Sequence, residues 1–138
     1  MTGQQAARLF LALTALVIAF HLALILGAPW GHLTSGGHWP WVLPIEGRVV
    51  STLSIVALTL VARTVAERAG LAKATLPRWS YAAVLVWLGL GAALNTITPS
   101  PMERALWLPV ILVMLACALQ VGRARARDFP AKNQAPDA

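Results

Sequence analysis

Hydrophobic residues along this chain gather in four long segments separated by short polar stretches. The first covers residues 9–28, the second lies between Arg48 and Arg63, and the others cover residues 79–94 and 105–121. An α-helix rises about 1.5 Å per residue, so about 20 apolar residues cross a hydrocarbon core of roughly 30 Å. The pattern therefore predicts an all-α, polytopic membrane protein with four transmembrane helices.

The polar residues beside each segment set the expected helix boundaries. The predicted helices cover residues 8–28, 45–69, 77–95 and 101–122, joined outside by loops 29–44 and 96–100. Gly70 is a natural stop for the second helix. Residues 1–122 are expected to form one bundle built from two helical hairpins. Residues 1–7 are expected to fray, and residues 123–138 to be a disordered basic tail.

The first segment also has to be distinguished from a cleaved signal peptide. It is longer than the hydrophobic region of most signal peptides, and Leu26 stands where cleavage after Ala28 would need a small residue. We therefore expect a retained first helix.

Composition supports a membrane protein. Hydrophobic residues make up 58% of the 138 residues and charged residues only 12%, whereas about 25% of the residues in soluble domains are charged. The single cysteine, Cys117, excludes an internal disulfide and a CxxC pair. It is expected to pack as a small hydrophobic residue.

The basic residues are distributed unequally across the predicted membrane. Of the 11 Lys and Arg residues, all but Arg48 and Arg104 fall on the side that carries both termini. By the positive-inside rule, we expect both termini on the cytoplasmic side of a cytoplasmic membrane. The net charge of +6 is thus a topology signal that favours contact with anionic lipids of the bilayer, and no nucleic-acid partner is expected.

Small residues recur on the first helix at four-residue spacing, at Ala15, Ala19, Ala23 and Gly27. Such a stripe lets another helix approach closely. The first interpretation is packing within the bundle. The alternative is an interface with a second copy or with a partner membrane protein.

His21 is the only ionisable side chain well inside the apolar depth of a segment. An intramembrane histidine is a candidate proton carrier, metal ligand or haem ligand. The alternative is a neutral imidazole that is hydrogen-bonded to Asn95, to a hydroxyl or to a backbone carbonyl. No other helix offers a second axial histidine, and Met114 is expected to lie too near the cytoplasmic side, so no cofactor is predicted.

The long outer loop contains His32 and His38, with Glu46 just beyond it. Two imidazoles and a carboxylate can bind zinc or copper. Their spacing matches no compact metal motif, so the two histidines are only weak metal candidates.

Glu46 and Glu103 each follow a proline, precede an arginine and open a helix. Ser100 and Glu103 have the spacing of a capping box, which accounts for Glu103 without catalysis. Alternatively, the outer polar residues line an outward-facing pocket. The candidate ligand-binding residues are His21, Trp30, Glu46, Arg48, Asn95, Glu103 and Arg104. No nucleophile, zinc-protease or phosphate-binding motif is present, so no catalytic residue is assigned and an enzyme is not expected.

Two stretches carry a resemblance to a known family. GAPWGHLTSGG followed by Leu43-Pro44 and Arg48, together with Asn95, Ser100 and ERALWLP, resembles a family of small four-helix bacterial integral membrane proteins of unassigned function. The chain departs from that pattern at Leu108, where glycine is usual, and at residues 38–41. The resemblance implies topology rather than activity.

The leading functional hypothesis is a non-enzymatic accessory or small-ligand-binding protein that acts through its outer loops. One alternative is a small oligomeric transporter or channel with a polar path through His21, Ser54 and Asn95. Another is an intramembrane metal or haem protein or an enzyme, which would require the histidines and glutamates to converge.

Overall fold

The computed structural model describes residues 1–128, and their side chains through residue 125. It contains helices α1 (Gly3–Ile25), α2 (Ile45–Arg68), α3 (Ser80–Ile97) and α4 (Pro101–Asp128). Two short 3₁₀ turns, η1 (Gly31–Leu33) and η2 (Ser35–Gly37), lie in the loop between α1 and α2. Four helices in the described part of the chain are long and apolar enough to cross a membrane. This confirms the prediction of an all-α chain with four candidate membrane spans.

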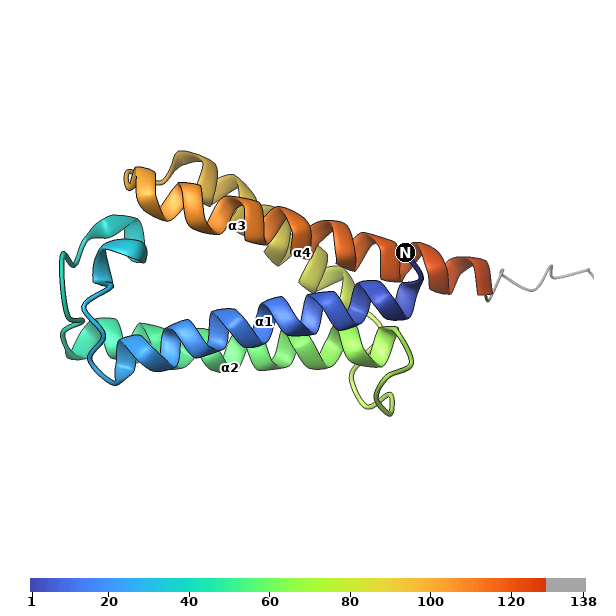
Figure 1. The fold of residues 1–138 in the computed structure, drawn as a ribbon. Coiled ribbons are helices and arrows are strands. Elements are labelled where there is room, and N and C mark those ends of the chain that lie inside the picture. The colour runs from blue at the N-terminus through green and yellow to red at the C-terminus, as the bar shows by residue number, and fades with distance from the viewer. Residues whose placement is uncertain (129–138) are drawn as a thin grey trace, which may run out of the picture.

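The helices form two pairs, α1 with α2 and α3 with α4 (Figure 1), and α1 also packs extensively against α4. The pairs meet near the N-terminus and separate toward the loop formed by residues 26–44 (Figure 1). We call the end where the pairs meet the terminal end, and the end that carries residues 26–44 the loop end. Gln120 of α4 donates a hydrogen bond to the carbonyl of Met1 (3.0 Å), so the start of the chain and the second half of α4 lie at the same end.

The buried core occupies the half of the bundle near the terminal end. The hydroxyl of Tyr81 donates to the carbonyl of Ala118 on α4, and a Cβ added to Gly122 would lie 3.3 Å from the Tyr81 ring. Helices α3 and α4 therefore approach each other closely at Ala118 and Gly122. The core cluster consists of Ala6, Ala7, Phe10, Val61, Val65, Tyr81, Val84, Leu88, Met114, Cys117, Ala118 and Val121.

The helix boundaries differ from the predictions at both termini. Thr2 and Gln5 form a reciprocal capping box, with Gln5 N–H donating to Thr2 Oγ1 (3.1 Å) and Thr2 N–H to Gln5 Oε1 (2.8 Å). The expected fraying of residues 1–7 is thus wrong, because this cap starts α1 at Gly3. α4 runs on to Asp128, beyond the predicted boundary at residue 122. The rest of the predicted tail, residues 129–138, lies outside the described residues.

Two residues of the small-residue stripe on α1 do not pack within the bundle. Ala15 and Ala19 are exposed, and a Cβ added to Gly27 would have no neighbour within 4 Å. α1 instead turns Phe10, Thr14 and neighbouring side chains toward α2 and α4. The predicted intramolecular packing is therefore wrong for Ala15 and Ala19.

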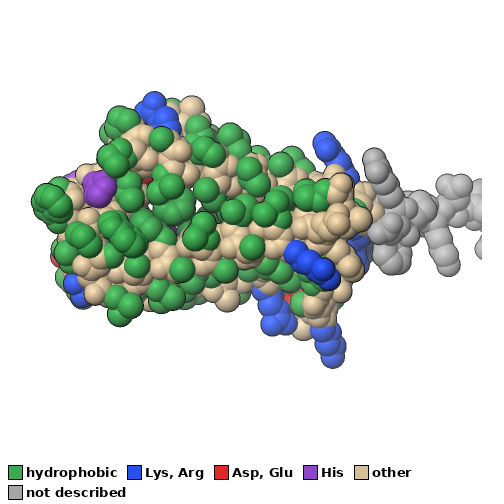
Figure 2. Space-filling view, viewed as in Figure 1, with side chains coloured by type: hydrophobic (Ala, Val, Ile, Leu, Met, Phe, Trp, Pro, Cys, Tyr) green, Lys and Arg blue, Asp and Glu red, His purple; other side chains and the backbone are tan. Residues whose placement is uncertain are grey.

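Hydrophobic side chains cover much of the face shown in Figure 2, and the Lys and Arg side chains on that face gather mainly at the terminal end. Leu16, Leu53 and Leu90, from three different helices, are each about 60% exposed. Soluble proteins rarely present so continuous an apolar surface. A bilayer would cover it, which indicates a multi-pass membrane protein.

Candidate ligand-binding cavity

A cavity of about 300 Å³ lies between the two helix pairs in the half of the bundle nearer the loop end. All four helices and the α1–α2 loop contribute to its wall. A hollow between hydrophobic side chains is visible on this face (Figure 2). Its lining is mostly aliphatic and aromatic, and the polar members are His21, Thr34, Ser35, Ser54, Asn95 and Glu103. A mostly apolar cavity with a few polar groups is the usual form of a small-molecule site.

The α1–α2 loop covers the cavity at the loop end because it is hydrogen-bonded to α4. The indole N–H of Trp107 donates to the carbonyl of Leu33 (2.7 Å), and the Ser100 hydroxyl donates to the carbonyl of His32 (3.2 Å). These two bonds place the 3₁₀ turns above the cavity, where Thr34 and Ser35 reach it.

The loop is also folded tightly on itself. The N–H of Gly31 donates to the carbonyl of Trp41 (2.8 Å). A Cβ at Gly31 would lie only 2.5 Å from the carbonyl oxygens of Trp39 and Trp41. Only glycine allows the two segments of the loop to approach this closely.

Aromatic rings form one wall of the cavity. Phe20 and Trp107 pack edge to face with their centroids 4.7 Å apart, and both line the cavity. Trp30 stacks on Phe20 at 6.2 Å but does not line the cavity, and it is 44% exposed. Trp87 lines the cavity as well.

Two residues that line the cavity each have a buried polar atom without a hydrogen-bond partner among the described residues. The two atoms are Nδ1 of His21 and Oδ1 of Asn95. The amide nitrogen of Asn95 is bonded, since it donates to the carbonyl of Gly91 (2.9 Å). The expected alternative, an imidazole satisfied by Asn95, a hydroxyl or a carbonyl, is therefore wrong for Nδ1. Buried polar groups without partners are uncommon, and each one needs a specific explanation.

Glu103 brings a carboxylate to the cavity. Its N–H donates to the hydroxyl of Ser100 (3.2 Å), which confirms Ser100 as the cap of α4. Its side chain accepts from the Thr98 hydroxyl (3.2 Å), and no bond back to the Ser100 N–H is formed among the described residues. The second half of the predicted capping box is thus absent, and the carboxylate lines the cavity instead.

The other charged candidates lie apart from the cavity and fix the ends of loops. Nε of Arg48 donates to the carbonyl of Leu43 (3.1 Å), and Nη2 of Arg104 donates to the carbonyl of Thr98 (2.6 Å). Glu46 is exposed in the first turn of α2. Of the residues predicted to line an outer pocket, His21, Asn95 and Glu103 therefore line the cavity, whereas Glu46, Arg48 and Arg104 do not.

The loop histidines lie outside the cavity as well. His38 is exposed and its ring packs edge to face against Trp39, with centroids 5.3 Å apart. His32 interacts through its backbone carbonyl. Within residues 1–125, no three His, Cys, Asp or Glu side chains are grouped so that they could hold a metal ion. His32, His38 and Glu46 do not converge.

The cavity ends inside the bundle. His21, Ser54 and Asn95 all line it, as the predicted polar path required. Toward the terminal end it stops at Leu88 and Met114, which are buried in the core cluster. Met114, which was expected near the cytoplasmic side, lies where the cavity meets the core cluster, and His21 lines the same cavity.

Several lining residues were missed in the sequence. A signal for those on α4 existed, because Trp107, Val110 and Ile111 follow helical spacing from the candidate Glu103 and share one face of α4 with it. Comparisons with protein-family models, curated proteins and solved structures find no match to this chain.

Proposed function

We propose that this chain is a non-enzymatic membrane protein that binds a small amphipathic molecule in the cavity between its helix pairs. The observation that carries the proposal is that two residues lining one cavity, His21 and Asn95, each contain a buried polar atom, Nδ1 and Oδ1, without a hydrogen-bond partner among the described residues. Leaving a buried polar group unpaired costs roughly 1–3 kcal/mol, so its presence on a cavity wall favours a ligand that satisfies it.

The lining indicates the chemistry of that ligand. Phe20, Trp87 and Trp107 provide apolar and aromatic surface for a hydrocarbon body. Asn95 Oδ1 and the Glu103 carboxylate accept hydrogen bonds, and a neutral imidazole nitrogen can accept as well. The best match is therefore a neutral or cationic molecule with an apolar body and a hydroxyl or amine head group.

The proposal includes a location and an orientation. The concentration of Lys and Arg at the terminal end supports cytoplasmic termini in a bacterial cytoplasmic membrane. The cavity would then lie in the outer half of the bilayer. Ala15 and Ala19, exposed on α1, would remain available for a second copy or a partner membrane protein.

Photo-crosslinking tests the proposal directly. The full chain in nanodiscs is irradiated with a diazirine-bearing fatty alcohol, and the modified residues are mapped by mass spectrometry. We expect labelling of cavity residues such as Val17 and Met114 that unlabelled alcohol reduces and the alkane of equal length does not. Labelling of lipid-facing Leu16 and Val56, both more than half exposed, should not respond to the competitor.

Asn95→Leu and Thr96→Val form a matched pair for this experiment. Thr96 is exposed on the same turn of α3, and its hydroxyl donates only to the carbonyl of Ala92 (2.9 Å). Asn95→Leu should weaken competition by the alcohol about tenfold, the effect of one buried hydrogen bond. Thr96→Val should leave competition unchanged. Equal competition by alcohol and alkane in the parent protein would refute the proposed polar head-group site.

A further inference from the structure

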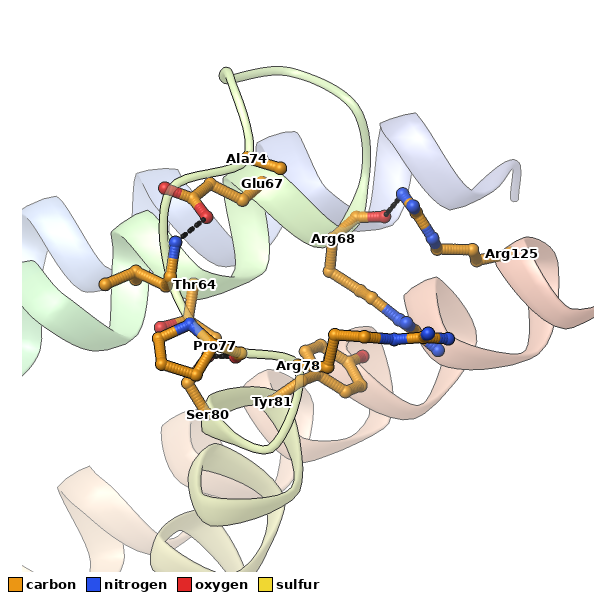
Figure 3. Close-up of a pocket in the computed structure, with 10 residues that line it drawn as sticks. Thr64, Glu67, Arg68, Ala74, Pro77, Arg78, Ser80, Tyr81 and Arg125 are labelled. Carbon is orange, nitrogen blue, oxygen red and sulfur yellow. Dashed lines mark hydrogen bonds between the residues drawn. The ribbon is translucent and has the colours of Figure 1, made fainter.

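The terminal end contains a second, basic pocket that is separate from the cavity described above. It has a volume of about 200 Å³ and lies where the end of α2, the α2–α3 loop and the start of α3 meet α4. Arg68, Arg78 and Arg125 line it together with Glu67 and Tyr81. Figure 3 shows the side chains of Arg68 and Arg78 extending to the same side, over Tyr81.

Arg68 is held in place at the centre of this pocket. Its guanidinium carbon lies 5.0 Å from the centroid of the Tyr81 ring, and its carbonyl accepts a hydrogen bond from Arg125 Nη1 (3.1 Å). Nε of Arg68 is buried and has no hydrogen-bond partner among the described residues. Arg68 therefore presents a positioned guanidinium with an unused donor.

The carboxylate in the pocket does not neutralise these arginines. Glu67 accepts the N–H groups of Thr75 (2.9 Å) and Leu76 (3.0 Å) and the Nε–H of Arg63 (2.9 Å). Arg63–Glu67 is the one ion pair within residues 1–125. Arg68 and Arg78 thus line the same pocket, and neither is paired with a carboxylate in it. A bound anion would stabilise this arrangement because it would oppose the repulsion between the two positive charges.

An apolar groove continues from the same arginines along the bundle. It has a volume of about 450 Å³, with Arg68, Arg78 and Arg123 at its basic end. Ala82 and Leu85 of α3 and Leu119 of α4 line the rest of it. A basic end followed by an apolar groove matches the head group and first acyl carbons of an anionic lipid, and basic pockets between membrane helices commonly bind such head groups.

We propose that Arg68 and Arg78 bind a phosphate group at the terminal end, and that the adjoining groove makes an anionic phospholipid the source of that phosphate. Guanidinium groups match phosphate oxygens with paired N–H donors. The bound lipid would join α2, α3 and α4 at the end of the bundle opposite the outer cavity. The site does not depend on the proposed function of that cavity.

Native mass spectrometry of the full chain in detergent micelles tests this site. Short-chain phosphatidylglycerol and phosphatidylcholine of equal chain length are titrated, and retained lipid is counted. We expect preferential retention of phosphatidylglycerol, which Arg78→Gln weakens at least about fivefold. The control is Lys73→Gln, which makes the same charge change at an exposed position of the same loop outside the pocket, and should have little effect.

Arg78 is preferred to Arg68 for the main variant because Arg78 is exposed and Arg68 packs on Tyr81. Equal retention of both lipids would overturn the site. Equal weakening by Arg78→Gln and Lys73→Gln would also overturn it, because the attraction would then come from overall charge. Displacement of phosphatidylglycerol by an equal concentration of inorganic phosphate would overturn the assignment of a lipid as the source.

Discussion

Replacing His21 with leucine should stabilise the ligand-free protein while impairing its binding of ligand. The imidazole packs edge to face with Phe20, at a centroid distance of 5.6 Å, and its Nδ1 is buried without a partner among the described residues. An unsatisfied buried polar group costs about 1–3 kcal/mol. Because His21 is only half-buried overall, we expect the lower end of this range. His21→Leu should therefore raise the free energy of unfolding by about 1 kcal/mol.

The measurement is reversible unfolding from mixed micelles into denaturing detergent, followed by tryptophan fluorescence and circular dichroism after exhaustive detergent exchange. Ser54→Ala is the matched control, because the Ser54 hydroxyl also lines the cavity but already donates to the carbonyl of Val50 (2.9 Å). It should change the free energy by no more than about 0.5 kcal/mol.

An increase in stability is informative because most substitutions destabilise a protein. If His21→Leu instead lowers the free energy of unfolding by about 1 kcal/mol or more, the imidazole makes a stabilising contact and the reasoning from its unpaired nitrogen fails. If stability rises but competition by the fatty alcohol is unchanged, His21 does not contact the ligand. Gain of stability with loss of binding is the expected signature of a residue retained for function.

Four further substitutions test the loop, helix α3 and the terminal end. Trp107→Phe removes the hydrogen bond from the indole to the carbonyl of Leu33 and should lower the free energy of unfolding by about 1 kcal/mol. Amide hydrogen exchange in η1 and η2, measured by mass spectrometry, should become faster. Gly31→Ala places a Cβ 2.5 Å from two carbonyl oxygens and should destabilise by roughly 1–3 kcal/mol in the unfolding assay. Gly89→Ala, where an added Cβ would have no neighbour within 4 Å, should raise the free energy of unfolding by about 0.5–1 kcal/mol. If Gly89→Ala destabilised the protein more than Gly31→Ala, this packing would be contradicted. Glu67→Gln weakens the contacts that hold the loop after α2, so trypsin should cleave that loop faster; an unchanged rate would show that Glu67 does not organise it.

The helices could be predicted from the sequence because their signals are local. The length of a continuous apolar segment can be counted directly in the sequence. Ser100 and Gly70 each mark a helix boundary through a hydrogen bond or a backbone angle that involves only residues a few positions away. Ser100 caps α4 through the N–H of Glu103, and Gly70 ends α2 with a φ of 73°. Both boundaries were therefore predictable.

The cavity could be predicted only in part, because its wall depends on contacts between distant segments. Trp107 reaches the carbonyl of Leu33 across 74 positions of the chain, and no local pattern encodes that bond. The buried face of α1 likewise depends on where α2 and α4 lie, which is why Ala15 and Ala19 were assigned to the wrong face. His21, Asn95 and Glu103 were found because polar side chains within or beside apolar segments are unusual wherever they point.

The two halves of the bundle differ in a way that bears on function. In a membrane, helices associate through close packing and hydrogen bonds rather than through the hydrophobic effect. Tyr81 and Ala118 supply both in the terminal half, where the core cluster lies. The other half contains the cavity. There the helix pairs are joined by the ring contact between Phe20 and Trp107 and by the hydrogen bonds of Trp107 and Ser100 to the loop. A ligand in contact with both pairs would therefore act where the protein's own packing is weakest, and its binding should order the loop and slow amide exchange there without changing the terminal half.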